Sequence, residues 1–251
     1  MSVTNFSLGP VAATIDVDDP TSDSNAGECT MSLSAPASRV STQGLNRIAT
    51  DLCWLLSLAT NSMMSAYQFP TETGTRSISV DGWINPAFSH IPVLPGRDIR
   101  TFVETTWSNF RRHVRGRKLV IPIHYLLLAD VPHQPMEISA LLTFVAWESL
   151  KHTWALKAGI PFKKGFFRTP SGNAIGFTTL SRRMLVSVGL HSGVERLAKL
   201  RNRIVHTGLG AVSYPQLERQ TTQTRILLLR YMFRLLGYVG SFHRGALTAH
   251  T

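Results

Sequence analysis

Residues 192–208 of the chain read Ser192-Gly193-Val194-Glu195-Arg196-Leu197-Ala198-Lys199-Leu200-Arg201-Asn202-Arg203-Ile204-Val205-His206-Thr207-Gly208. Ser192 and Glu195 form a capping box, in which the serine side chain accepts from the glutamate amide while the carboxylate reaches back. Gly208 is a natural helix terminator. The stretch therefore predicts a helix with both of its ends marked.

This predicted helix has an apolar stripe that is interrupted by an arginine. The stripe contains Val194, Leu197, Ala198, Ile204 and Val205, and the same register assigns Arg201 to the inward face. Burial of an unpaired guanidinium is costly, so Arg201 needs a partner or a purpose. An arginine paired with a core carboxylate, beside a capping histidine, is one interpretation. A reactive site is the other, and the helix alone favours the first.

The polar residues of this helix have a defined spacing. Asn202 and His206 are four residues apart and so lie on one face, whereas Arg201 and His206 are about 140° apart on an ideal helix. The segment Arg201–His206 resembles the R-x4-6-H signature of the HEPN superfamily, in the form with Asn after Arg. Residues 230–240 and 144–150 are similar to segments of prokaryotic Abi-type, ApeA-like HEPN proteins. The resemblance extends more weakly to 52–60, and so covers most of residues 45–243.

The resemblance implies metal-independent cleavage of RNA, in which a ribose 2′-hydroxyl attacks the adjacent phosphate. His206 would act as general base or acid, and Arg201 would neutralise charge on the phosphate oxygens. Asn202 would orient His206, and Glu148 would anchor Arg201. Arg203 is a second cation in the motif, which either binds phosphate or points to solvent. No metal or cofactor is expected, and a homodimer would complete the site.

The composition predicts a folded, basic protein. The 251 residues are 43% hydrophobic, enough for a core, and the formal charge is +11. Residues 1–42 hold five of the 15 acidic residues but only one of the 26 basic ones, so the remainder is strongly basic. Such a surplus attracts nucleic acid or an anionic membrane, although it also serves solubility.

The cysteines and the apolar runs bear on the cellular compartment in which the protein is expected. Cys29 and Cys53 have the spacing of neither a disulfide framework nor a metal site, which favours a reducing, cytoplasmic setting. No signal peptide is recognisable at the amino terminus. The apolar run 226–236 is interrupted by Arg230 and Arg234 and is too short to cross a bilayer. We therefore expect a soluble protein that does not bind membranes.

Along the chain we expect a mainly α fold, a HEPN-type helical bundle with a small β-containing amino-terminal addition. Residues 1–42 are poor in large apolar side chains and are expected to be a disordered tail. An amino-terminal helix from Leu45 and short strands, for example at 77–80, occupy 43–97. The HEPN-like domain covers 98–243, and 244–251 form a flexible end.

Between the amino-terminal helix and the basic region three further helices are expected. The first is capped by Asp98, with a face of Ile99, Phe102, Val103, Thr106, Phe110 and Val114. Its end carries Arg111, Arg112, Arg115 and Arg117, which suit the helix dipole or bind phosphate. The second covers 121–129. The third runs from Pro135 to Ala158, with a buried stripe of Ile138, Leu141, Leu142 and Val145 and with Glu148 in the same register.

Residues 160–190 are expected to be irregular and basic. Cations alternate there with aromatic residues, namely Lys163, Lys164, Arg168, Arg182 and Arg183 with Phe162, Phe166, Phe167 and Phe177. Such a mixture holds RNA through stacking and phosphate contacts, or packs the loop onto the helices; both interpretations are open.

The function expected from these features is that of an endoribonuclease, such as a defence, abortive-infection or toxin-like effector with a regulatory partner or antitoxin. The alternative is a non-catalytic HEPN module that binds RNA, a nucleotide or a protein partner. A third possibility is an adenylyl-accepting or nucleotide-binding HEPN protein that acts with a nucleotidyltransferase.

Overall fold

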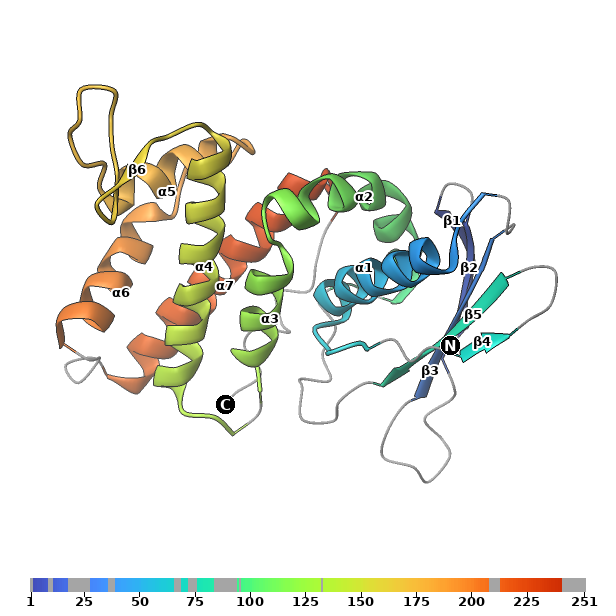
Figure 1. The fold of residues 1–251 in the computed structure, drawn as a ribbon. Coiled ribbons are helices and arrows are strands. Elements are labelled where there is room, and N and C mark those ends of the chain that lie inside the picture. Colours follow the sequence, from blue (N-terminus) through green and yellow to red (C-terminus); the bar gives the residue numbers. More distant parts are fainter. Residues whose placement is uncertain are drawn as a thin grey trace. The chain divides into compact units, whose positions relative to one another are not determined.

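The computed structural model describes seven helices and seven strands. The residues described are 2–8, 11–17, 28–35, 39–65, 69–71, 76–83, 94, 96–131, 133–207 and 213–240. They divide into two compact units, the first extending to Arg111 and including Gly240, and the second comprising Arg112–Val239. The boundary between the two units lies inside a helix, α2 (Gly96–Gly116). Figure 1 shows the described helices and strands.

The first unit contains an antiparallel sheet in the order β1-β2-β3-β5-β4. Its strands are β1 (Ser2–Leu8), β2 (Val11–Val17), β3 (Glu28–Ala35), β4 (Phe69–Thr71) and β5 (Arg76–Trp83). Helix α1 (Thr42–Thr60) packs against β3 and β5. The Ser41 side chain caps α1 by accepting from the Gly44 amide at 3.0 Å. The predicted amino-terminal helix and the strand at 77–80 are therefore confirmed.

Strands β1, β2 and β3 lie where the composition predicts a disordered tail. Val11 and Ala13 are buried and Ala12 between them is exposed, and Leu33 and Ala35 are buried on either side of half-buried Ser34. This is the period-two pattern of a strand with one covered face. The pattern mixes Val11 and Leu33 with the small residues Ala13 and Ala35, so large apolar residues alone mark it only sparsely.

Helix α2 has the buried face that the sequence predicts. Phe102, Val103, Thr106, Phe110 and Val114 are all buried. Asp98 lies within the first turn rather than at the cap, because the helix begins at Gly96. The arginines near its end differ in their surroundings. Arg111 pairs with Asp51 at 3.3 Å, and the buried Arg117 donates to the Tyr231 hydroxyl at 3.0 Å.

The second unit is a group of helices around α4 (Met136–Lys157). Helix α4 packs against α3 (Val120–Leu128), α5 (Phe177–Val186) and α7 (Tyr214–Leu236), and α6 (Val194–Thr207) packs against α5 and α7. Trp147 of α4 is fully buried, and its indole N–H donates to the Ser181 hydroxyl of α5 at 3.0 Å. These contacts confirm the mainly α class and hold α4, α5 and α6 together.

The buried face of α4 is not the one predicted. Ile138 and Leu141 are 43% and 42% exposed, and the other members of the predicted stripe, Leu142, Val145 and Glu148, are half-buried. The buried face instead contains Ala140, Thr143, Phe144, Trp147, Leu150, Lys151 and Trp154. Since α4 is apolar on both sides, periodicity alone does not select a face. Packing against three neighbouring helices does.

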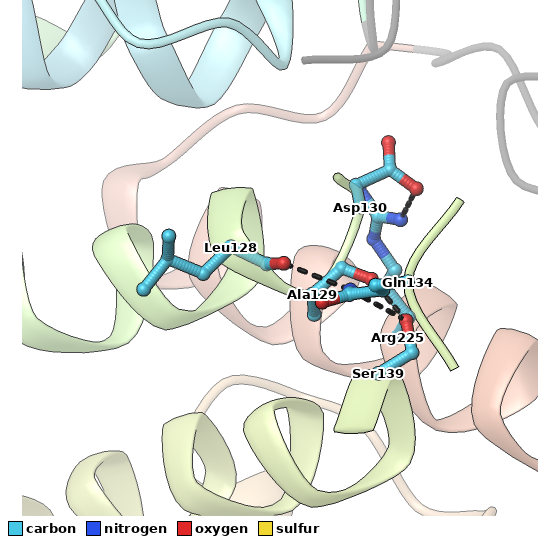
Figure 2. A network of polar contacts seen from close by, with 6 residues as sticks. All are labelled: Leu128, Ala129, Asp130, Gln134, Ser139 and Arg225. Atoms are coloured by element: carbon cyan, nitrogen blue, oxygen red, sulfur yellow. Dashed lines mark hydrogen bonds and ion pairs between the residues drawn. The ribbon is translucent and has the colours of Figure 1, made fainter. Parts of the chain in front are cut away.

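A buried ion pair joins α7 to the turn that follows α3. Arg225 pairs with Asp130, and both side chains are almost completely buried. Figure 2 shows this pair beside a second set of polar contacts. Gln134 Nε2 donates to the Leu128 carbonyl at 2.9 Å and to Ser139 Oγ at 3.3 Å, and the Ser139 hydroxyl donates to the Ala129 carbonyl. The α3–α4 connection is thereby tied to the middle of α7.

His113, near the end of α2, lies among cations. Burial, followed by the charges of Lys157, Arg117 and Arg112, lowers the pKa of His113 from 6.5 to about 4. Its buried Nδ1 has no hydrogen-bond partner within the described residues. The folded protein therefore holds this imidazole neutral under mildly acidic conditions.

Acidification is expected to destabilise the protein through His113. Between pH 6.5 and about 4 the unfolded chain binds a proton at this residue that the folded chain does not, so stability falls as pH falls. The full shift corresponds to roughly 3 kcal/mol, and partial exposure reduces the expected loss to about 1–2 kcal/mol. Urea unfolding of wild type and His113→Gln at about pH 7 and about pH 4.5 measures it. His191→Gln, at an exposed histidine, is the control; equal acid sensitivity in His113→Gln and wild type would contradict the prediction.

Candidate functional site

The arginine motif lies on α6, the helix that the capping box predicts. The helix begins at Val194, one residue after the box would start it, and follows Gly193, whose φ of 102° favours glycine. Val194, Leu197 and Leu200 are buried, and Arg201 in the same register is half-buried. Arg201 is therefore partly covered, with its terminal nitrogens close to Asn202.

Arg201 is held by an aromatic ring and by its neighbour on the helix. Its guanidinium carbon lies 5.6 Å from the centre of the Phe177 ring, and Nη1 donates to Asn202 Oδ1 at 3.3 Å. The buried Nε has no hydrogen-bond partner in the part of the chain that the structure describes. A half-buried guanidinium beside an aromatic ring is suited to bind an anion through its terminal nitrogens.

A second cation, Lys151 of α4, lies over the same ring. Its Nζ is 4.5 Å from the centre of the Phe177 ring and 2.5 Å from Glu148 Oε2. Desolvation lowers the pKa of Lys151, the charge and hydrogen bond of Glu148 raise it, and the charge of Arg201 lowers it further. Arg201 and Lys151 are therefore close enough to repel each other.

Glu148 was expected to anchor Arg201, and the structure pairs it with Lys151. The Glu148–Lys151 pair is an i, i+3 contact within α4. Lys151 is the residue that the sequence reading missed. Its three-residue spacing from Glu148 could have indicated an ion pair within the helix. A lysine is, however, ordinarily expected to be solvent-exposed.

Phe177 is the centre of the arrangement and belongs to a segment predicted to be irregular. It is the first residue of α5, and its ring lies 5.8 Å from that of Phe144 on α4, centre to centre. Three helices thus contribute to one small site: α4 provides Lys151 and Glu148, α5 provides Phe177, and α6 provides Arg201.

The structure describes the other two residues of the motif, Asn202 and His206, less fully than Arg201. Asn202 is exposed and accepts from Arg201. His206 has its backbone in the last turn of α6, while its side chain lies outside the described residues, as does Gly208. The geometry between Arg201 and His206 side chains is therefore left as predicted from the sequence.

The predicted RNA-binding cations fall into two groups. Lys163, Lys164 and Arg183 are exposed. The others make polar contacts: Arg168 donates to the Gly172 carbonyl at 2.7 Å, Arg182 pairs with Glu195 at 2.9 Å, and Arg203 donates to Gln220 at 3.2 Å. The Glu195 pKa is lowered by a hydrogen bond from its own backbone amide and then by Arg182, as suits an acid at a helix start.

Comparison with known proteins found no relative. No protein-family model matches the chain, no curated protein is similar to it, and no solved structure matches it. In the described ranges no helix is long and apolar enough to span a bilayer. Nor do those ranges contain a group of three or more His, Cys, Asp or Glu side chains arranged to hold a metal ion.

Proposed function

We propose that the protein is a HEPN-type endoribonuclease that cleaves RNA without a metal ion, with Arg201 and His206 as catalytic residues. The observation that carries the proposal is the pair of cations over Phe177. Arg201 is half-buried beside this ring, and Lys151 lies over the same ring with Glu148 as its ion-pair partner. Two cations with a single half-exposed acid leave a positive charge that a phosphate would neutralise.

The proposed reaction is a transesterification followed by release of the leaving strand. A ribose 2′-oxygen attacks the adjacent phosphorus, the P–O5′ bond breaks, and the products carry a 2′,3′-cyclic phosphate and a 5′-hydroxyl. His206 accepts the 2′-hydroxyl proton or protonates the leaving oxygen. Arg201 donates to the phosphate oxygens as their charge grows, and Asn202 restrains its side chain through their 3.3 Å contact.

The proposal also covers the location of the protein in the cell and its binding partners. A homodimer that completes the site and control by a regulatory partner or antitoxin follow from the HEPN resemblance, and a cytoplasmic location follows from the spacing of the two cysteines. Such an enzyme would act as a defence, abortive-infection or toxin-like effector.

The nuclease reaction is tested by the chemistry of its products. Purified protein is incubated with total RNA in EDTA, and the ends of the fragments are identified. We expect fragments with 2′,3′-cyclic phosphate and 5′-hydroxyl ends, because the attacking group is supplied by the RNA itself. Cleavage that EDTA abolishes, or fragments with 3′-hydroxyl ends, would contradict the proposal.

The second candidate is a non-catalytic RNA-binding module, which a specific feature of the sequence favours. Residues 149–194 contain seven lysines and arginines and no aspartate or glutamate. Their exposed cations would bind phosphates whether or not a reaction follows. Protein that binds RNA in EDTA and leaves it intact would support this candidate over the nuclease.

A further inference from the structure

A short hairpin after α4 presents an aromatic ring to solvent. Strands β6 (Phe162–Lys163) and β7 (Phe166–Phe167) pair in antiparallel register, Phe162 with Phe167 and Lys163 with Phe166. The segment follows the carboxyl end of α4, beside α5 (Figure 1). Phe166 is 58% exposed, which is unusual for a side chain of its size.

The two faces of the hairpin differ. Phe162 and Phe167 share one face and pack on His152 of α4, with ring centres 5.1 and 5.2 Å from the histidine. Lys163 and Phe166 share the opposite face, because side chains alternate along a strand. Directly opposed residues have Cβ atoms about 4.5–5.5 Å apart. An exposed ring therefore stands beside an exposed ammonium group.

The hairpin is held rigid. Its turn residues Lys164 and Gly165 have φ values of 51° and 80°, the left-handed conformation that two-residue hairpin loops require. Arg168 Nη1 donates to the Gly172 carbonyl at 2.7 Å, and the Ile175 amide donates to the Phe167 carbonyl at 2.7 Å. The base of the hairpin is thus fastened to the loop that follows. Its tip is open, since a Cβ at Gly165 would meet nothing within 4 Å.

We propose that Phe166, with Lys163 and Lys164, forms a stacking finger that binds a base and the neighbouring phosphates of single-stranded RNA. The inference rests on the proposed function for its choice of RNA. An exposed ring stacks on a base of any identity, and adjacent cations follow the backbone. The exposed Lys163 and Lys164 give the hairpin tip the positive charge that attracts RNA.

The exposed ring favours single-stranded RNA over double-stranded RNA. In a duplex the base faces are covered by their neighbours, and the major groove is too narrow for side chains, so a protruding phenylalanine has nothing to stack on. A membrane surface is less suited to this hairpin, because Phe166 stands among lysines and Phe162, although 45% exposed, packs on His152 on the opposite face.

The finger stands next to the candidate site along α4. His152, on which Phe162 and Phe167 pack, directly follows Lys151, whose ammonium group lies over Phe177. Consecutive residues of a helix point about 100° apart, so an RNA strand would pass part of the way around α4 between a phosphate at Arg201 and Lys151 and a base at the hairpin. The role of the finger is to position the substrate, and it takes no part in the reaction itself.

The test is binding of a fluorescent single-stranded oligouridylate with 2′-O-methyl groups, measured by anisotropy. This RNA lacks the 2′-hydroxyl nucleophile, so binding is measured whether or not the protein is a nuclease. Phe166→Ala is expected to weaken binding about five- to hundredfold. Phe166→Tyr should bind within about twofold of wild type, and Phe166→Leu should bind as weakly as Phe166→Ala, because stacking needs a ring.

The matched control is Tyr214→Ala, which removes a ring that is 55% exposed at the start of α7. It should bind RNA like wild type, and all variants should have the melting temperature of wild type because both rings are exposed.

Failure of the wild type to bind, or wild-type affinity in Phe166→Ala or Phe166→Leu, would overturn the proposed stacking finger. Phe166-dependent binding to phosphatidylserine vesicles with unchanged RNA affinity would replace it with a membrane contact. Protein that binds through Phe166 yet cleaves no RNA would retain the finger and reject the nuclease.

Discussion

Replacing Arg201 by alanine is expected to slow RNA cleavage by about 10²–10³-fold, the usual effect of removing one preorganised donor from a developing oxyanion. The guanidinium is fixed before substrate arrives, by the Phe177 ring and by the hydrogen bond to Asn202. Its forked terminal nitrogens would donate to the phosphate oxygens. The measurement is the single-turnover cleavage rate of a short RNA at saturating protein.

Two substitutions give this prediction its controls. Arg203→Ala removes an arginine two residues along α6 that donates to Gln220 at 3.2 Å, and it should cleave at nearly the wild-type rate. Arg201→Lys keeps the charge but lacks the forked donors, so its rate should lie between those of wild type and Arg201→Ala. Equal losses in Arg201→Ala and Arg203→Ala would mean that general basic charge, rather than the placement of Arg201, supports cleavage. His206→Ala is expected to lose about 10²–10⁴-fold as a general acid or base.

The largest expected loss of stability follows from breaking the Asp130–Arg225 pair. Arg225→Ala leaves the Asp130 carboxylate in the same buried position without its opposite charge. Removal of one partner from such a pair lowers the free energy of unfolding by about 3–5 kcal/mol. The same change would detach the middle of α7 from the α3–α4 connection seen in Figure 2. Urea unfolding followed by circular dichroism measures it.

The controls for the pair use the same helix. Arg219→Ala removes an exposed arginine of α7 and should change stability by no more than about 0.5 kcal/mol. The double variant Asp130→Leu with Arg225→Met should recover much of the loss, since apolar residues of similar volume often replace a buried pair without penalty. If Arg225→Ala were as stable as Arg219→Ala, the Asp130–Arg225 ion pair would not be what stabilises the contact between α7 and the α3–α4 connection.

The helices that could be predicted are those whose sequence has one apolar face and marked ends. α6 is the clearest case, because its capping box, glycine and stripe together placed Arg201 inward. α4 could be located but not oriented, since Ile138 and Leu141 form a second apolar row opposite Trp147. A choice between two such rows depends on neighbouring helices, which are distant in sequence.

Other features escaped prediction for different physical reasons. The strands at 2–8, 11–17 and 28–35 place a few large apolar residues among many small and polar ones, so their alternation is recognised only once the partners in the sheet are known. Lys151 escaped because its burial depends on Glu148 and Phe177 together, and Phe177 comes from another helix. The candidate site was thus predictable on α6 and not where α4 and α5 complete it.

The left-handed turn at Lys164 and Gly165 has a consequence for the entropy of recognition. A two-residue loop with both residues at positive φ allows the hairpin few alternative shapes. The freedom of these residues is lost when the chain folds, rather than when a partner arrives. A preorganised surface binds without the unfavourable ordering that a disordered basic loop of the same composition would undergo. The entropy lost in ordering the hairpin around Phe166 therefore lowers the stability of the folded protein and does not weaken binding of a ligand.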